Sequence, residues 1–192
     1  MSLINSTAIP SSGGYEIDQS LRFNDDDVAY LSRTPSSAGN RKTWTWSGWV
    51  KLGLVSTSTK LIFSTDGTTD STYASLRLGA DYRLWFGKYT TLLKGAEPLI
   101  RDPSAWYHII LALDTTQATE ADRIKFYING VETTQQSSGT IALNEDLGIN
   151  TTQQHAIGRQ NLSGGSLYLD GYLAEVNFID GLAKAPADFG ET

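Results

Sequence analysis

The two histidines of this 192-residue chain, His108 and His155, are its only candidates for the base of a Ser–His–Asp arrangement. His108 lies in the apolar segment WYHIILALD, whose pattern is typical of a buried strand. His155 begins a predicted strand after a Gln-rich loop. We therefore interpret both histidines as structural, and we expect no catalytic residues.

Two acidic segments offer the oxygen ligands that calcium prefers. The segment STDGTTDST carries Asp66 and Asp70, and the segment NDDD carries residues 25–27. Neither segment has the regular spacing of an EF-hand, and an acidic loop is often a solvated turn. We expect that the protein requires no cofactor; if it binds calcium, Asp66 and Asp70 are the preferred ligands.

Three of the five tryptophans lie in the segment TWTWSGWVKL. Alternate side chains of a strand share a face, so Trp44 and Trp46 lie on an apolar face and are predicted to be core. Trp49 has the other parity, among hydroxyls and a lysine. A bulge at Gly48 or a half-buried seat would make Trp49 structural, whereas an exposed Trp49 would contact a sugar or a partner chain.

Short β-type segments, separated by turn residues, fill the chain from residue 21 onward. About ten strands and no long helical pattern predict an all-β fold, an antiparallel sandwich or barrel. LRF and VAYLS flank NDDD as a hairpin-like pair. Residues 106–113 are apolar on both parities apart from His108, which predicts a central strand covered on both faces. The best helical candidate is APADFG, where Pro186 could open a short turn.

Residues 1–20 are polar and loop-like, so we expect an extended arm before one domain of residues 21–192. The first residues resemble no secretory signal peptide, and we expect synthesis in a cytoplasm. A net charge of −6 with scattered Lys and Arg argues against nucleic-acid or membrane partners. The chain has no cysteine, which excludes disulfides and thiolate metal sites.

Five motifs follow one another in the order of a known fold family. They are Trp49 in WTWSGWVKL, Trp106 and His108 in WYHIILALD, KFYING at 125–130, Ile157 and Gly158 in HAIGR, and GYLAEV at 171–176. Over residues 21–190 the chain resembles the laminin-G-like, concanavalin A-like jelly roll. The amino-acid sequence around these motifs is similar to that of domains in tailed-phage structural proteins, including fibre-like ones. The resemblance implies two antiparallel sheets packed face to face, one of them concave.

The resemblance also implies several kinds of partner, because relatives use such surfaces for glycans, for protein partners or for assembly. Sugars have a hydroxyl rim and an apolar face, so the contact candidates are the aromatics Trp49, Tyr82, Trp85 and Tyr89. Each of these can instead be a structural aromatic. Related laminarinases carry a Glu-x-Asp-x-(x)-Glu run that Asp170 and Glu175 do not reproduce, so we expect no hydrolase activity.

We expect a non-enzymatic structural protein of a phage virion, on the capsid or tail surface. Its arm and sheet edges would dock on other virion proteins, and it would form a homo-oligomer, a trimer by analogy with fibres and capsid decorations. The alternative is a receptor-binding lectin module of a tail fibre that recognises host-surface glycans. Assembly requires docking at the arm and edges, whereas a lectin requires aromatics exposed on a concave face or loop rim.

Overall fold

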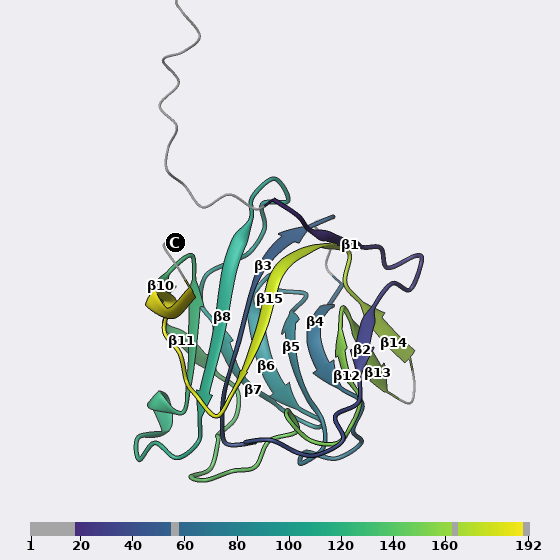
Figure 1. The fold of residues 1–192 in the computed structure, drawn as a ribbon. Coiled ribbons are helices and arrows are strands. Elements are labelled where there is room, and N and C mark those ends of the chain that lie inside the picture. The colour runs from purple at the N-terminus through teal and green to yellow at the C-terminus, as the bar shows by residue number, and fades with distance from the viewer. Residues whose placement is uncertain (1–17, 55–57, 163–164, 190–192) are drawn as a thin grey trace, which may run out of the picture.

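The fold is known from a computed structural model that describes residues 18–54, 58–162 and 165–189 (Figure 1). Fifteen strands and two short 3-10 helices lie in these residues. The elements are β1 (Leu21–Phe23), β2 (Leu31–Arg33), β3 (Thr43–Leu52), β4 (Lys60–Thr65), β5 (Ala74–Leu78), β6 (Leu84–Lys88), β7 (Leu92–Ala96), β8 (Tyr107–Asp114), η2 (Glu120–Asp122), β9 (Ile124–Ile128), β10 (Val131–Glu132), β11 (Gln135–Ser137), β12 (His155–Ile157), β13 (Arg159–Leu162), β14 (Gly165–Tyr168), β15 (Gly171–Asp180) and η3 (Pro186–Phe189).

Two large antiparallel sheets form a sandwich, which confirms the predicted all-β jelly roll (Figure 1). The six-stranded sheet has the order β1-β15-β3-β8-β9-β10, and the seven-stranded sheet has the order β11-β7-β6-β5-β4-β12-β2. The β13–β14 hairpin forms a third small sheet beside β4. No helix among the described residues is long and apolar enough to cross a membrane.

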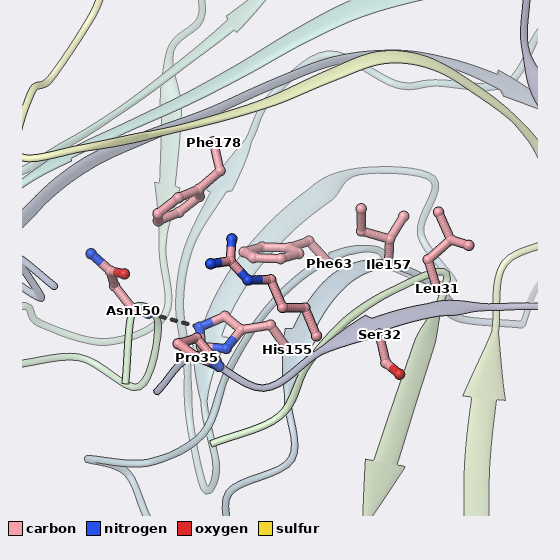
Figure 2. A pocket seen from close by; sticks show the side chains of 9 residues that line it. Leu31, Ser32, Pro35, Phe63, Asn150, His155, Ile157 and Phe178 are labelled. Atoms are coloured by element: carbon pink, nitrogen blue, oxygen red, sulfur yellow. Dashed lines mark hydrogen bonds between the residues drawn. The ribbon is translucent and has the colours of Figure 1, made fainter. Parts of the chain in front are cut away.

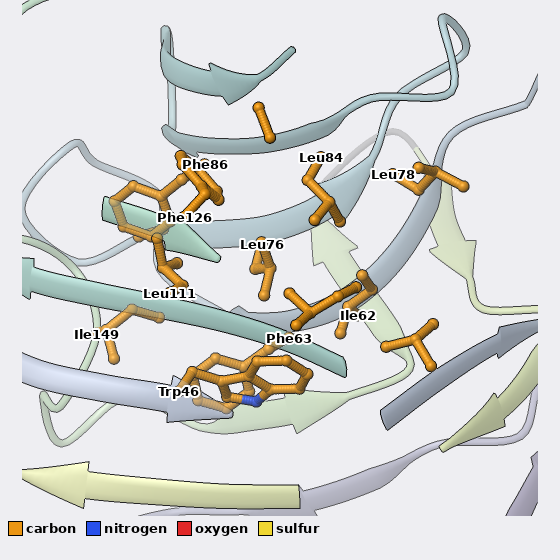
Figure 3. Packing of buried hydrophobic residues seen from close by; sticks show 14 of the residues in the cluster. Trp46, Ile62, Phe63, Leu76, Leu78, Leu84, Phe86, Leu111, Phe126 and Ile149 are labelled. Carbon is orange, nitrogen blue, oxygen red and sulfur yellow. The ribbon is translucent and has the colours of Figure 1, made fainter. Parts of the chain in front are cut away.

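The core between the sheets is built from the alternate apolar residues of the strands, as Figure 3 shows. Trp44 and Trp46 of β3 are both 0% exposed, which confirms the prediction from their parity. The Trp44 ring meets Phe86 of the opposite sheet edge to face, with ring centroids 5.7 Å apart. Because side chains from both sheets interlock here, the core fixes how one sheet sits on the other.

The last described residues cover the back of the six-stranded sheet. β8 is central in this sheet, as its two apolar parities predicted. Residues 181–189, the C-terminal strap, turn back after β15 (Figure 1). The Thr45 hydroxyl donates to the Leu182 carbonyl and accepts from the Lys184 amide, both at 2.8 Å. The predicted helical turn at Pro186 is confirmed as η3, within this strap.

The predicted pairing of LRF with VAYLS is wrong. β1 pairs with β15 in one sheet, and β2 pairs with β12 in the other. The acidic turn therefore carries the chain between the sheets, and Asp25 is held there by Lys60 at 2.7 Å. A local pattern cannot separate a hairpin from such a crossing, because partner strands come from distant sequence.

Three strands lie where the sequence predicted turns or no strand. β11 and β13 fall in the segments QQSSGT and QNLSGG, which were interpreted as turns, and β7 was not predicted. β7 and β11 pair with each other, and β13 pairs with β14. Cross-strand hydrogen bonds rather than apolar alternation stabilise these short strands.

Candidate functional site

A row of residues crosses the outer face of the seven-stranded sheet. On β11, β7, β6, β5 and β4 the paired residues are Gln136, Gly95, Trp85, Arg77 and Leu61. Leu84 and Phe86, on either side of Trp85, are buried in the core. Trp85 must therefore point outward, and we call this set the Trp85 row.

Contacts on two sides fix the position of the Trp85 indole, and we call these contacts the Trp85 seat. A Cβ atom on Gly95 would lie 2.7 Å from Cε3 of the indole, so the ring rests directly on the glycine backbone. At the other edge, Nε1 donates to both carboxylate oxygens of Asp81 at 3.1 Å. The side chain is half-buried, so part of the ring remains at the surface. A fixed aromatic with an accessible surface suits stacking against a sugar ring.

Tyr82 lies in the turn that precedes β6, next to Asp81. Its amide donates to the Gly79 carbonyl at 3.0 Å, and its carbonyl accepts from Ile100 at 2.8 Å. The Arg101 guanidinium lies 6.0 Å from the centre of its ring. The structure therefore brings Tyr82 and Trp85, two of the predicted contact residues, to the same end of β6.

Tyr89 lies just past the other end of β6, four positions after Trp85. At the rise of a strand this is about 13 Å away. The Tyr89 ring meets Tyr73 edge to face at 6.0 Å, and it is 37% exposed. Tyr73 has the same parity as Ser75 and Arg77, which places the Tyr89 contact on the outer face as well.

Arg77 is the charged member of the Trp85 row. It is half-buried, and burial lowers the pKa of its guanidinium while Tyr73 opposes that shift. Among the described residues, no carboxylate lies within 4.0 Å of its nitrogens and no hydrogen bond to it forms. Arg77 is not among the contact residues predicted from the sequence, because its place opposite Trp85 is seen only in the strand register.

The two predicted calcium ligands have separate protein partners. Asp66 accepts from Arg159 at 2.8 Å, and both side chains are largely buried. Asp70 accepts from the amide and hydroxyl of Thr90, both at 3.0 Å, and the amide is the largest cause of its lowered pKa. In the described part of the chain, no three His, Cys, Asp or Glu residues gather around one point. Calcium binding by Asp66 and Asp70 stays a prediction.

Trp49 lies on the outer face of the other sheet, half-buried. Its ring stacks on His108, with centroids 4.9 Å apart and an interplanar angle of 23°. Of the two structural alternatives for Trp49, the structure shows the half-buried position and no bulge at Gly48, because β3 pairs with β8 without a shift from Thr43 to Val50. The bulge is in β15 instead, between Ala174 and Asn177. Gly48 has another role: a Cβ there would lie 2.9 Å from the Trp46 ring.

Beside Trp49 lies a polar cleft of about 380 Å³ that contains a serine–histidine pair. The Ser47 hydroxyl lies 3.0 Å from Nε2 of His108, but Ser47 is only 1% exposed. No described residue bonds to Nδ1 of His108, where a triad would place its acid. Burial lowers the pKa of His108, and Glu175 opposes this shift. The arrangement suits a structural histidine.

An apolar slot of about 240 Å³ opens between the sheets, as Figure 2 shows. Phe178 of β15 faces Phe63 across the slot. Leu31 and Ile157 line one end of the slot, and His155 lies toward the other end, beside Asn150. The alternation in LSR and HAI placed these apolar side chains on one face, but only the fold shows that the face is open.

The hydrogen bonds of His155 fix its protonation state. Nε2 accepts from the Asn150 amide at 2.9 Å, and Nδ1 lies 2.9 Å from the Gln153 carbonyl, to which it must donate. The ring is therefore neutral, and burial is the main reason for its lowered pKa. His155 thus anchors the 148–155 loop at the slot.

The fold is shared with many solved structures, and the three described below have 14–18% sequence identity to this chain. A putative carbohydrate-binding protein from Bacteroides ovatus aligns with a TM-score of 0.61 and 18% identity, over 89% of this chain and 45% of that one. Domains LG4-5 of the mouse laminin α1 chain align with a TM-score of 0.59 and 14% identity, over 92% and 45%. This chain thus spans less than half of either protein.

A third structure has nearly the same length. It is the Ruminococcus gnavus sialidase domain CBM40, solved with α2,3-sialyllactose, with a TM-score of 0.52 and 14% identity over 84% of this chain and 95% of that one. At these identities the alignments establish the fold alone. Comparison with curated protein sequences gave no match.

A family model covers most of the described domain. It matches residues 24–186, from the acidic turn after β1 to the start of η3. The match agrees with the two-sheet architecture, the order of the motifs and the solved structures. The chain therefore belongs to the concanavalin A-like lectin/glucanases superfamily, in the family Laminin_G_3.

Proposed function

We propose that this chain is a carbohydrate-binding module whose glycan site is the Trp85 row and its flanking tyrosines. The observation that carries this proposal is the Trp85 seat, in which Gly95 and Asp81 hold a partly exposed indole on a sheet face. Tyr82 and Tyr89 stand at the two ends of the same strand. An aromatic platform with polar neighbours is the pattern that sugars require.

Structural relatives support this proposal over assembly alone. The CBM40 domain was solved with sialyllactose, and a domain of an arabinanase from Geobacillus stearothermophilus was solved with arabinotriose. Those ligands belong to those proteins. Because fold likeness does not transfer a ligand, the proposal for this chain depends on its own side chains.

We propose no catalytic role for this module. Asp170 is buried and lies 3.4 Å from Arg22, beside the start of β15. Glu175 lies on the β15 bulge, at the cleft that contains Trp49. Neither of these two carboxylates lies in the Trp85 row, so they could not flank the bond of a glycan bound there.

A glycan array tests this function with three proteins. We expect the wild type to bind a subset of glycans, Trp85→Ala to lose that binding, and Trp49→Ala to keep it. Trp49→Ala is the matched control because it removes another half-buried outer-face tryptophan, from the opposite sheet. If Trp49→Ala lost glycan binding and Trp85→Ala kept it, the glycan site would lie at the polar cleft beside Trp49 and not at the Trp85 row.

The second candidate function is the structural component of a phage virion predicted from the sequence. Two features favour an assembly role. β2 is the edge of its sheet, and in the described residues Asn177–Asp180 of β15 has a strand on one side only. Between these edges, Leu31 is 48% and Phe178 is 37% exposed. Residues 1–17 of the predicted arm lie outside the described residues.

Native mass spectrometry with and without residues 1–20 tests assembly. A trimer that becomes a monomer without residues 1–20 would support docking through the arm. A monomer in both forms would contradict the assembly role and leave the glycan module as the sole proposal.

A further inference from the structure

The side chain next to Trp85 points to the class of sugar that the Trp85 row takes. We propose that the row selects acidic sugars: Arg77 binds the carboxylate of a sialic or uronic acid whose ring lies on Trp85. This inference rests on the proposed carbohydrate-binding function and adds the chemical class of the ligand.

Arg77 differs from the other buried arginines of the described chain. Arg123 donates to three backbone carbonyls at 2.7–2.8 Å, and Arg159 pairs with Asp66 at 2.8 Å. Arg77 has lost part of its hydration and has neither kind of partner. A half-buried cation without an anion is unfavourable, and an anionic ligand would offset that cost.

The register places Arg77 where a sugar substituent would reach it. Arg77 and Trp85 are direct cross-strand partners on the same face. Neighbouring strands lie about 4.8 Å apart, so a pyranose stacked on Trp85 extends over the adjacent strand. A carboxylate on that ring can accept the two parallel hydrogen bonds that a guanidinium donates.

Two carboxylates that could repel an acidic ligand at the row have protein partners. Asp81 accepts from the Trp85 indole and lies 3.8 Å from Arg83. Asp66, whose charge reaches Tyr73, is paired with Arg159. These contacts offset much of the negative charge that would repel an acidic ligand, although the chain as a whole carries −6.

The experiment compares acidic sugars with their neutral counterparts by isothermal titration calorimetry. The probes are 3′-sialyllactose against lactose, and trigalacturonate against its methyl ester. The proteins are wild type, Arg77→Gln, Arg77→Lys, Trp85→Ala and the control Arg33→Gln. Arg33 is an exposed arginine on β2, at the slot, so its replacement makes the same charge change away from the row. Circular dichroism melting confirms that each variant is folded.

We expect wild type to bind at least one acidic probe, and its neutral counterpart at least tenfold more weakly. Arg77→Gln should weaken acidic binding by about 10- to 100-fold, the usual effect of losing hydrogen bonds to a charged group. Arg77→Lys should fall between, because lysine keeps the charge and loses the paired geometry. Arg33→Gln should match wild type.

Three results would overturn the inference. Equal binding of neutral and acidic probes, lost in Trp85→Ala and unchanged in Arg77→Gln, would keep the proposed function and reject acidic selectivity. Acidic binding that survives Trp85→Ala would place recognition outside the row. No binding of wild type to these probes or to any arrayed glycan would reject both the inference and the proposed function.

Discussion

Gly95 controls the position of the Trp85 indole, because any side chain there would occupy the place of the ring. We predict that Gly95→Ala displaces the indole and weakens glycan binding, at a stability cost of about 1–3 kcal/mol from overpacking. Calorimetry and urea unfolding measure the two effects. In a Trp85→Ala background the same change should cost little stability, because the ring that the new Cβ would meet is absent, and an undiminished cost would disprove the coupling.

His155 makes the folding stability depend on pH, at pH values above those at which carboxylates titrate. Its pKa is lowered in the folded state, so the unfolded chain takes up the proton first as the pH falls. This contribution to stability is fully present above pH about 6.5, the unfolded value, and is lost as the pH falls through the folded pKa. His108 titrates with the same sign.

We therefore predict that the free energy of unfolding in urea declines as the pH falls below about 6.5. The decline should be smaller in His155→Gln, which cannot take up a proton. An equal decline in wild type and in the double variant with His108→Gln would contradict this assignment to the histidines.

The parity of residues in one strand predicted the buried positions of Trp44 and Trp46 correctly. It could not predict what surrounds them. The position of the Trp85 indole depends on Gly95 from β7 and on Asp81 from a turn. That Arg77 lies opposite Trp85 depends on the register between β5 and β6. Tyr89 was likewise selected from its residue type, while its contact with Tyr73 comes from the loop packing.

At the scale of elements, the C-terminal strap is held to β3 through one hydroxyl. Thr45→Val keeps the volume but removes the donor to Leu182 and the acceptor for Lys184. We predict a loss of about 1–3 kcal/mol in unfolding free energy, because two buried hydrogen bonds disappear. Faster amide exchange over the strap and β8 should accompany it.

Thr43→Val is the matched control on the same face of the same strand. Its hydroxyl contacts Asp114 at 3.4 Å, which is a weaker bond at a less buried position. The control should cost less and leave amide exchange in the strap unchanged. Equal effects of the two substitutions would show that Thr45 does not hold the strap.

The long strands β3 and β8 were predictable, β3 because its apolar residues alternate and β8 because both of its parities are apolar. Short strands such as β7 and β11 carry too few residues for a pattern, and their pairing is seen only in the fold. The β1 and β2 segments were predicted as strands but not as members of different sheets, since sheet membership is decided by β15 and β12.

At the scale of the whole molecule, the two outer faces differ. The strap packs on part of the six-stranded sheet, at Thr45 and His108, whereas the Trp85 row lies on the seven-stranded sheet. The motifs in the sequence predicted the jelly roll and the two kinds of partner, glycan or protein. They could not decide which face carries a site, because that depends on which segments pack over each sheet.

The most direct test of glycan binding at the Trp85 row is a titration of the 15N-labelled protein with the strongest glycan of the array, or with 3′-sialyllactose if several bind equally. The five indole N–H signals report on all five tryptophans at once. We predict that the Trp85 signal shifts most and the Trp49 signal stays in place. A shift of Trp49 with Trp85 unchanged, or no shift in any indole, would contradict a glycan site on the seven-stranded sheet.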